Sequence, residues 1–175
     1  MRAWYKGSGN KKLGGNYGPT IKPAKVVAKH GYDQILWLLD DYVSEVGVMN
    51  LFVFWYNEDG EKELITCPLD GTILPGVTRK SVLELASHWN EFKVTEERFK
   101  IQEVIKAIEE GRLIEMFGCG TAAIISPINN IGYKGKDYPI PINKELNSGE
   151  LANRLANEIG DIQSRLKREL GNLRW

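Results

Sequence analysis

A lysine beside a glycine-rich turn is the first pattern in the sequence that could do chemistry. Lys12 stands just before Gly14, Gly15 and Asn16, and Tyr17 follows them directly. Consecutive glycine and asparagine residues allow positive φ angles and a close approach of the backbone to a ligand. An amine that is partly desolvated on such a turn becomes nucleophilic. The same residues also fit an exposed turn with solvated lysines, so other parts of the chain must decide between the two.

A glutamate at the start of an apolar segment is the second candidate. Residues 44–56 form the most strand-like stretch of the chain, and Glu45 lies at its beginning. The pattern predicts one strand here, a hairpin turn at residues 57–60 and a return strand. A carboxylate beside buried strands requires a cation or a hydrogen-bond donor. A strand-end glutamate that faces water is the other interpretation, and Glu45 alone does not separate the two.

Two loops that contain glycine could bind an anion. The first is the Pro-Gly pair at residues 75–76, which precedes a predicted helix with Thr78 as its N-cap. Backbone N–H groups at the start of a helix point outward and attract negative charge. The second loop covers residues 118–123, where two glycines and Thr121 would supply N–H and hydroxyl donors. A capped helix and a β-bulge would use the same residues.

A lysine, a tyrosine, a carboxylate and an anion-binding loop are the groups that pyridoxal phosphate requires. Its aldehyde forms a Schiff base with an amine, which Lys12 could supply, and its phosphate needs oriented N–H donors. Its pyridine nitrogen stays protonated beside a carboxylate such as Glu45, so that the ring accepts electrons. Its phenolate oxygen needs a donor, which Tyr17 could supply. Other anionic ligands are compatible with the same residue types.

Composition limits the classes to which the chain can belong. The 175 residues suffice for one domain with a substantial core, and 23 basic residues balance 23 acidic ones. This balance predicts binding neither to nucleic acid nor to a membrane, and no apolar run has the length of a membrane span. The polar first residues do not resemble a secretion signal.

Cysteine and histidine positions predict no metal site. Cys67 and Cys119 are far apart and match no metal-ligand spacing, so we expect two free thiols in a reducing compartment. His30 and His88 lie in helical segments that carry no second ligand, and we expect both to be structural.

Apolar strands, hairpins and amphipathic helices alternate along the chain, and this alternation predicts a mixed α/β fold. The expected strands cover residues 34–39, 44–56, 62–67, 92–94, 113–117 and 124–126, and a further hairpin covers residues 129–141. Helices are expected at residues 19–30, 78–89 and 101–108. A long last helix follows a capping box at residues 147–150 and should turn these side chains inward: Leu151, Leu155, Ile159, Ile162 and Leu166.

Four stretches carry a resemblance to a known family. They are Lys12-Leu13-Gly14-Gly15-Asn16-Tyr17-Gly18, Glu45-Val46-Gly47-Val48-Met49-Asn50-Leu51-Phe52, Leu69-Asp70-Gly71-Thr72-Ile73-Leu74-Pro75-Gly76-Val77-Thr78-Arg79 and Glu115-Met116-Phe117-Gly118-Cys119-Gly120-Thr121-Ala122. In this order they resemble the successive motifs of branched-chain amino-acid aminotransferases, which are class-IV, fold-type-IV pyridoxal-phosphate enzymes. The resemblance is closest to eukaryotic members. It implies a barrel-like, curved β-sheet flanked by helices, the large C-terminal domain of the class-IV aminotransferase fold.

The resemblance implies a catalytic role for one lysine. Lys12, rather than Lys11, matches the lysine that forms the Schiff base and moves the proton. Tyr17 matches the tyrosine bonded to the phenolate oxygen of the cofactor, and Glu45 matches the partner of its pyridine nitrogen.

The resemblance also implies sites for the phosphate and the substrate. Val77 and Thr78 match the residues whose N–H groups hold the phosphate, and Thr121 contributes there too. Thr121 and Ala122 match the turn that receives the substrate carboxylate. Leucine, isoleucine and valine would be the amino donors and 2-oxoglutarate the acceptor.

The resemblance covers only part of such an enzyme. It assigns residues 1–163 to the cofactor-binding C-terminal domain and leaves residues 164–175 as a divergent helical tail. The small N-terminal domain of the family is missing from this sequence, so we expect weak or no activity from the chain alone. Ala123 and Ser126 replace the redox cysteine pair of some vertebrate members. The family implies a homodimer in the cytoplasm or the mitochondrion.

Two other hypotheses remain open on the sequence. D-amino-acid aminotransferases and aminodeoxychorismate lyases share the fold and the cofactor but catalyse other reactions. A non-catalytic fragment that retains the fold is the hypothesis from another class, and the missing domain motivates it.

Overall fold

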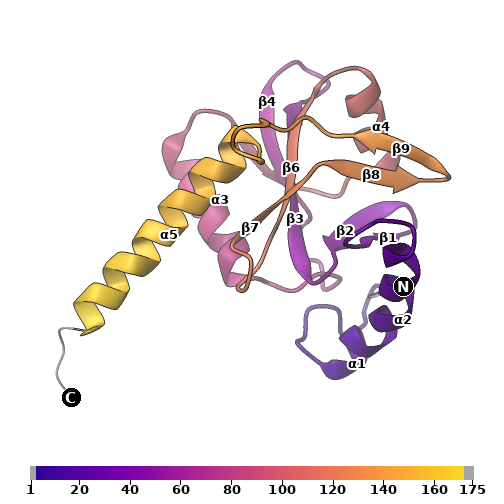
Figure 1. The fold of residues 1–175 in the computed structure, drawn as a ribbon, viewed down its shortest axis with the longest axis horizontal. Coiled ribbons are helices and arrows are strands. Elements are labelled where there is room, and N and C mark those ends of the chain that lie inside the picture. The colour runs from indigo at the N-terminus through magenta and orange to yellow at the C-terminus, as the bar shows by residue number, and fades with distance from the viewer. Residues whose placement is uncertain (1–2, 172–175) are drawn as a thin grey trace.

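Two strands, β3 (Met49–Tyr56) and β6 (Leu113–Cys119), lie antiparallel at the centre of the sheet (Figure 1). The computed structural model describes residues 3–171, with side chains described up to residue 165. The other strands of this seven-stranded sheet are β1 (Leu36–Leu39), β2 (Tyr42–Val46), β4 (Lys62–Thr66), β5 (Lys93–Glu96) and β7 (Ile125–Ile128). All pairings are antiparallel except β4 with β5. The predicted mixed α/β fold is confirmed, although the sheet does not close into a barrel within the described residues.

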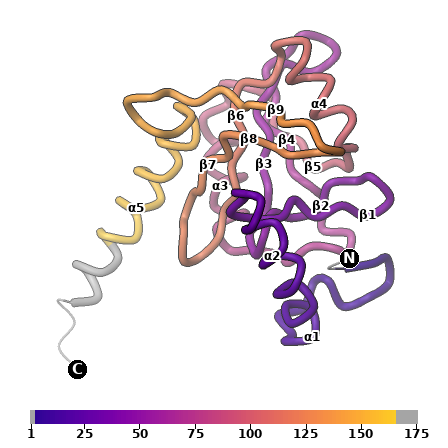
Figure 2. The backbone as a smooth tube through the Cα atoms, turned by 45° about the vertical axis from the view of Figure 1, so that its right-hand side comes forward, coloured from indigo at the N-terminus to yellow at the C-terminus, as the bar shows by residue number. Residues whose placement is uncertain are grey.

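The two faces of the sheet bury separate apolar clusters, because successive side chains of a strand point to opposite faces. On one face, Phe52 and Phe54 pack with helices α3 (Val77–Trp89) and α5 (Glu150–Gly171). On the other face, Val53 and Trp55 pack with α4 (Ile101–Glu109) and with the small hairpin of β8 (Asn130–Tyr133) and β9 (Lys136–Pro139). Figure 2 shows this layering from a second direction.

The predicted single strand at residues 44–56 is wrong, because a tight turn divides it into β2 and β3. Gly47 in this turn has φ = 58°, and a Cβ there would lie 2.1 Å from Oε1 of Gln34. Only glycine meets both conditions without strain. The hydrophobic pattern did not mark this turn, because both strands are buried and the apolar run continues across it. Its effect is to fold Glu45 back opposite Asn50.

The first helical segment contributes little to the core. The predicted helix at residues 19–30 consists of a 3₁₀ turn (Gly18–Thr20) and α2 (Ile21–Ala28). No residue of α2 is buried, and the exposed fractions of Ile21 and Val26 are 58% and 50%. The expected buried strand at residues 34–39 is the half-buried edge strand β1.

The last helix projects from the body of the molecule (Figure 1). Leu151, Leu155 and Ile159 are buried as predicted, but Ile162 is 44% exposed because the helix has left the sheet by then. The side chain of Leu166 lies outside the described residues. The predicted boundary between residues 163 and 164 falls inside this helix, whose backbone continues to Gly171. None of the helices in residues 3–171 is long and apolar enough to cross a membrane.

The cap of α5 comes from a strand rather than from its own sequence. The carboxylate of Glu115 in β6 accepts the N–H groups of Leu151 at 2.8 Å and Ala152 at 3.0 Å. The capping box expected at residues 147–150 is therefore replaced by a contact between residues far apart in the chain. A strand residue satisfies the otherwise unpaired N–H groups of the first helical turn.

Candidate functional site

Glu45 is buried at the end of β2 and bound to the loop that leads into α3. Its side chain is 1% exposed. Its Oε1 accepts the backbone N–H of Leu74 at 2.9 Å and a proton of Asn50 Nδ2 at 3.3 Å. The sequence-based expectation that this carboxylate needs a hydrogen-bond donor is therefore met by a backbone amide and a neighbouring strand. Burial of a carboxylate in a low-dielectric surrounding makes its charge act strongly on a nearby ligand.

The first turn of α3 has the features of an anion-binding site. Gly76 is the N-cap, with φ = −69° and ψ = 137°, and no side chain caps the helix. The first turn contains no acidic residue. The prediction of Thr78 as the N-cap is wrong, because Thr78 is the second helical residue and is buried, while Val77 is 69% exposed. The N–H groups of Val77 and Thr78 thus begin a helix whose dipole favours negative charge.

Arg79 adds a buried positive charge to this turn. It is 3% exposed, donates from Nη2 to the carbonyl oxygen of Cys67 at 2.8 Å and pairs with Glu96. Arg79 therefore fixes the helix start against the ends of β4 and β5. Arg79 was not among the residues predicted for the site, although a charged residue at the end of a buried motif is a signal for such a role.

The loop that carries Thr121 and Ala122 follows the end of β6. Cys119, the last residue of β6, pairs with Asn50, which in turn faces Glu45. Gly120 donates its N–H to the carbonyl oxygens of Ala123 at 3.2 Å and Ile124 at 3.4 Å, which closes the loop tightly. Thr121 and Ala122 are exposed. The strand register therefore brings this loop to the same end of the sheet as Glu45.

Lys12 lies on the segment before α1 (Gly14–Tyr17), and its side chain is exposed. The predicted glycine-rich turn is wrong, since Gly14 and Gly15 form a short helix; neither glycine uses the positive φ that its type allows. Within the described residues, Lys12 forms no hydrogen bond or ion pair with Glu45 or Thr78. In the part of the chain that the structure describes, Lys12 is therefore not brought into contact with the other predicted site residues.

Asn16 and Gly9 anchor this lysine segment. Asn16 donates from Nδ2 to the carbonyl oxygens of Ser8 at 2.6 Å and Lys11 at 2.7 Å. A Cβ on Gly9 would lie 2.6 Å from the carbonyl oxygen of Thr72, so this segment packs against the loop that continues to Leu74. Tyr17 is half-buried at the end of α1.

The two cysteines are buried in the core, and we expect their thiols to be unreactive. Both are free and buried. Burial raises the pKa of each thiol to about 12, against the opposing effect of the Arg79 charge. Residues 3–171 contain no cluster of three or more metal-ligating side chains.

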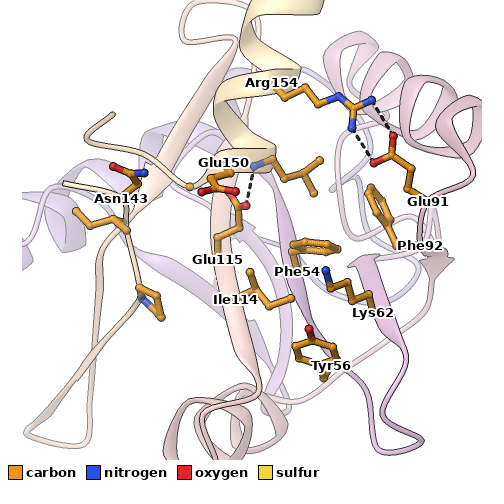
Figure 3. Close-up of a pocket in the computed structure, with 14 residues that line it drawn as sticks. Phe54, Tyr56, Lys62, Glu91, Phe92, Ile114, Glu115, Asn143, Glu150 and Arg154 are labelled. Atoms are coloured by element: carbon orange, nitrogen blue, oxygen red, sulfur yellow. Dashed lines mark hydrogen bonds and ion pairs between the residues drawn. The ribbon is translucent and has the colours of Figure 1, made fainter. Parts of the chain in front are cut away.

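A separate cavity of about 580 Å³ lies on the face covered by α5 (Figure 3). None of the predicted site residues lines it. Its walls include Phe54, Phe92 and Glu115, and Arg154 at its rim binds Glu91 at 2.8 and 2.9 Å (Figure 3). Glu115 is engaged in capping α5. We therefore place the candidate site at the other end of the sheet, around Glu45.

Known proteins resemble this chain over most of its length. The family model described as amino-transferase class IV matches residues 1–131. The chain is 60% identical over 164 residues to the branched-chain-amino-acid aminotransferase of Dictyostelium discoideum, a match that covers 93% of this chain and 43% of that protein. It is 50% identical to the mitochondrial enzyme of that name from Schizosaccharomyces pombe and 48% identical to the cytosolic one from Mus musculus, of which it covers 39% and 42%. Each match includes 93% of this chain, so the chain spans less than half the length of these relatives.

Solved structures show the same likeness. The branched-chain amino acid aminotransferase of Escherichia coli superposes with a TM-score of 0.70 at 25% identity, covering 91% of this chain and 46% of the other. The branched-chain aminotransferase of Thermoproteus uzoniensis, solved with norvaline, gives a TM-score of 0.67 at 25% identity, covering 86% and 43%. A third such enzyme, from Thermobaculum terrenum and solved in its pyridoxal-phosphate form, shares the fold with a TM-score of 0.68 at 24% identity, covering 89% and 45%.

Proposed function

Because the chain belongs to the amino-transferase class IV family, we propose that residues 1–163 supply the cofactor-binding domain of a branched-chain-amino-acid transaminase. The observation that carries the proposal is the hydrogen bond between Glu45 and the Leu74 amide. It joins a buried carboxylate to the loop that ends at the uncapped start of α3. A carboxylate and an anion site held together in this way match the two ends of pyridoxal phosphate.

The residues present fit this cofactor. The N–H groups of Val77 and Thr78, with Thr121, would hold the phosphate, because they start a helix with a glycine cap and no acidic residue. Glu45 would face the pyridine nitrogen and Tyr17 the phenolate oxygen. When bound, pyridoxal phosphate supplies an aldehyde for an amine and a ring that accepts electrons.

Each group of the chain would then have a separate role in amino transfer. The amine of Lys12 would attach the cofactor and, once displaced by substrate, its Nζ would take the proton from the substrate Cα and deliver it to the cofactor carbon. The buried carboxylate of Glu45 would keep a proton on the ring nitrogen, since a low-dielectric surrounding strengthens that interaction. The exposed loop of Thr121 and Ala122 would bind the substrate carboxylate.

Branched-chain amino acids are the substrates that we propose. A cavity of about 570 Å³ has Val46 and Met49 in its walls, but its lining is polar as well as apolar and includes none of the predicted site residues, so the substrate class rests on the relatives. The relatives named above carry the same substrate class in their names. We propose leucine, isoleucine and valine as donors and 2-oxoglutarate as acceptor.

The exposure of Lys12 indicates that a further wall closes the site. We propose that the remainder of the family's chain and a second copy, in a homodimer, supply it. Residues 164–175 are proposed to lie outside the cofactor-binding domain. The assembled protein would work in the cytosol or the mitochondrion, as the names of the relatives allow. The chain alone should turn over leucine and 2-oxoglutarate weakly or not at all.

Borohydride reduction in the presence of pyridoxal phosphate tests the proposal. Peptide mass spectrometry should find the label on Lys12. Lys12→Ala should abolish it, while the matched control Lys11→Ala should keep it. Labelling of another lysine, or none, would contradict the assignment. Normal turnover by the isolated chain would contradict the predicted need for a further wall. Preference of the full-length protein for D-alanine would contradict the substrate class.

A further inference from the structure

Asn50 lies between the two halves of the candidate site. It is the second residue of β3, is 5% exposed and faces Glu45 across the β2–β3 hairpin. Its Nδ2 donates to the carbonyl oxygen of Leu74 at 2.8 Å and to Oε1 of Glu45 at 3.3 Å. The N–H of Leu74 donates to the same oxygen of Glu45 at 2.9 Å. The three residues therefore form a closed ring of hydrogen bonds.

The other side of the Asn50 amide contacts the start of α3. A Cβ on Gly76 would lie 2.2 Å from Oδ1 of Asn50. Gly76 is the N-cap, and the N–H groups of Val77 and Thr78 follow it directly. One buried side chain thus touches the carboxylate at one end of the site and the helix start at the other. A glycine at position 76 is what allows this close approach.

We propose that Asn50 is a positioning residue that fixes the Glu45 carboxylate relative to the first turn of α3, so that one rigid unit receives both the ring and the phosphate of the cofactor. The inference rests on the proposed function. Removing the side chain leaves the Leu74 carbonyl and the Glu45 carboxylate without a shared donor in a buried place. Of this ring, Glu45 then keeps only the bond from the Leu74 N–H, and its position relative to α3 is less fixed, since a buried polar network holds its geometry only when it is complete.

Asn50→Ala tests the inference with pyridoxamine 5'-phosphate as the probe, because this ligand carries the ring and the phosphate but forms no bond to lysine. The first readout is the absorbance titration of the bound ring. We expect the variant to release the ring proton about one pH unit lower than the parent, since Glu45 is no longer oriented. The second readout is the affinity for inorganic phosphate, measured by competition. We expect it to fall about tenfold as the start of α3 shifts.

Thr66→Val is the matched control. Thr66 is also fully buried in the same sheet and donates from Oγ1 to the carbonyl oxygen of Leu51 at 2.6 Å, but it touches neither Glu45 nor Gly76. It should lower stability and leave both readouts unchanged. If Thr66→Val changed both readouts as much as Asn50→Ala does, the effect would be a general loss of stability, and the inference would be overturned.

Gly76→Ala disturbs the same contact, because the added Cβ would displace the Asn50 amide. This variant provides the test if Asn50→Ala does not fold. It should shift both readouts in the same direction as Asn50→Ala. A change in only one readout, in either variant, would overturn the bridging role. Failure of the parent chain to bind pyridoxamine 5'-phosphate would instead contradict the proposed function, so the two failures are distinguishable.

Discussion

The carboxylate of Glu115 in the central strand β6 accepts the N–H of Leu151, the second residue of α5, at 2.8 Å. A second bond at 3.0 Å joins it to Ala152. The long last helix is therefore attached to the sheet by an ionisable group that is only 3% exposed (Figure 3). Burial raises the pKa of this carboxyl above its usual range, although the two N–H bonds oppose the shift and the charge of Glu150 adds to it.

Replacing Glu115 by glutamine should change how stability depends on pH. Because the folded pKa is raised above the unfolded one, the folded state binds the proton more readily than the unfolded state does. The stabilising contribution is present below the unfolded pKa and is lost as pH rises through the folded pKa. The advantage of the parent over Glu115→Gln should therefore shrink as pH rises through this window. Urea unfolding at stepped pH measures it, and an advantage that grows with pH would contradict the raised pKa.

Gly149→Ala should destabilise the fold. A Cβ at this position would lie 1.8 Å from Oε2 of Glu115, so the carboxylate must move away from the helix it caps. We expect a loss of roughly 1–3 kcal/mol in the free energy of unfolding. Gly160→Ala is the matched control, because nothing lies within 4 Å of its Cβ and it is inside α5 itself. That change should stabilise the protein by about 0.5–1 kcal/mol. Equal effects would refute the role of Gly149.

Val77→Pro should weaken phosphate binding without breaking α3. Proline is tolerated at the first helical position, and the extended conformation of Gly76 is compatible with a following proline. The change removes one N–H from the anion site, and we expect the affinity for pyridoxamine 5'-phosphate to fall about tenfold. Pyridoxamine, which lacks the phosphate, should bind as before. Val77→Ala keeps the N–H and serves as the control; equal weakening for both ligands would count against this phosphate site.

Cys67 and Cys119 should resist alkylation in the folded protein. Burial raises the pKa of both thiols to about 12, so little thiolate exists near neutral pH, and their side chains are 3% and 1% exposed. Intact-mass measurement after iodoacetamide treatment should show no adduct in the folded state and two in urea. Modification of the folded protein would show that the core beneath the site opens.

Periodicity predicted most of the fold because the relevant forces are local. The α4 helix, with Ile101 and Val104 buried, and the hairpin of β3 and β4 around residues 57–60 lie where the pattern placed them. The Gly47 turn was missed since burial on both faces hides a boundary between strands. The exposure of Ile162 was missed because amphipathicity shows which side of a helix could be buried, but not where its neighbours end.

The candidate site was predictable residue by residue only in part. Glu45 stood out as a carboxylate beside an apolar run, and its need for a donor followed from burial alone. Asn50 did not stand out, because its role depends on the β2–β3 turn that brings it opposite Glu45. The capping of α5 by Glu115 was equally inaccessible, since strand and helix meet only in three dimensions.

The central place of β3 also determines the order in which the site assembles. One edge of β3 meets β2 and β4 through short turns, whereas its other edge stays open until β6 arrives from much later in the chain. Pairings between distant segments form slowly, because the intervening loop must first lose its freedom. During synthesis, Glu45, Asn50 and Leu74 are therefore available to one another before the Thr121 loop exists. The contacts that hold Glu45 to the loop before α3 can therefore form before the segment that would complete the phosphate and substrate contacts through Thr121.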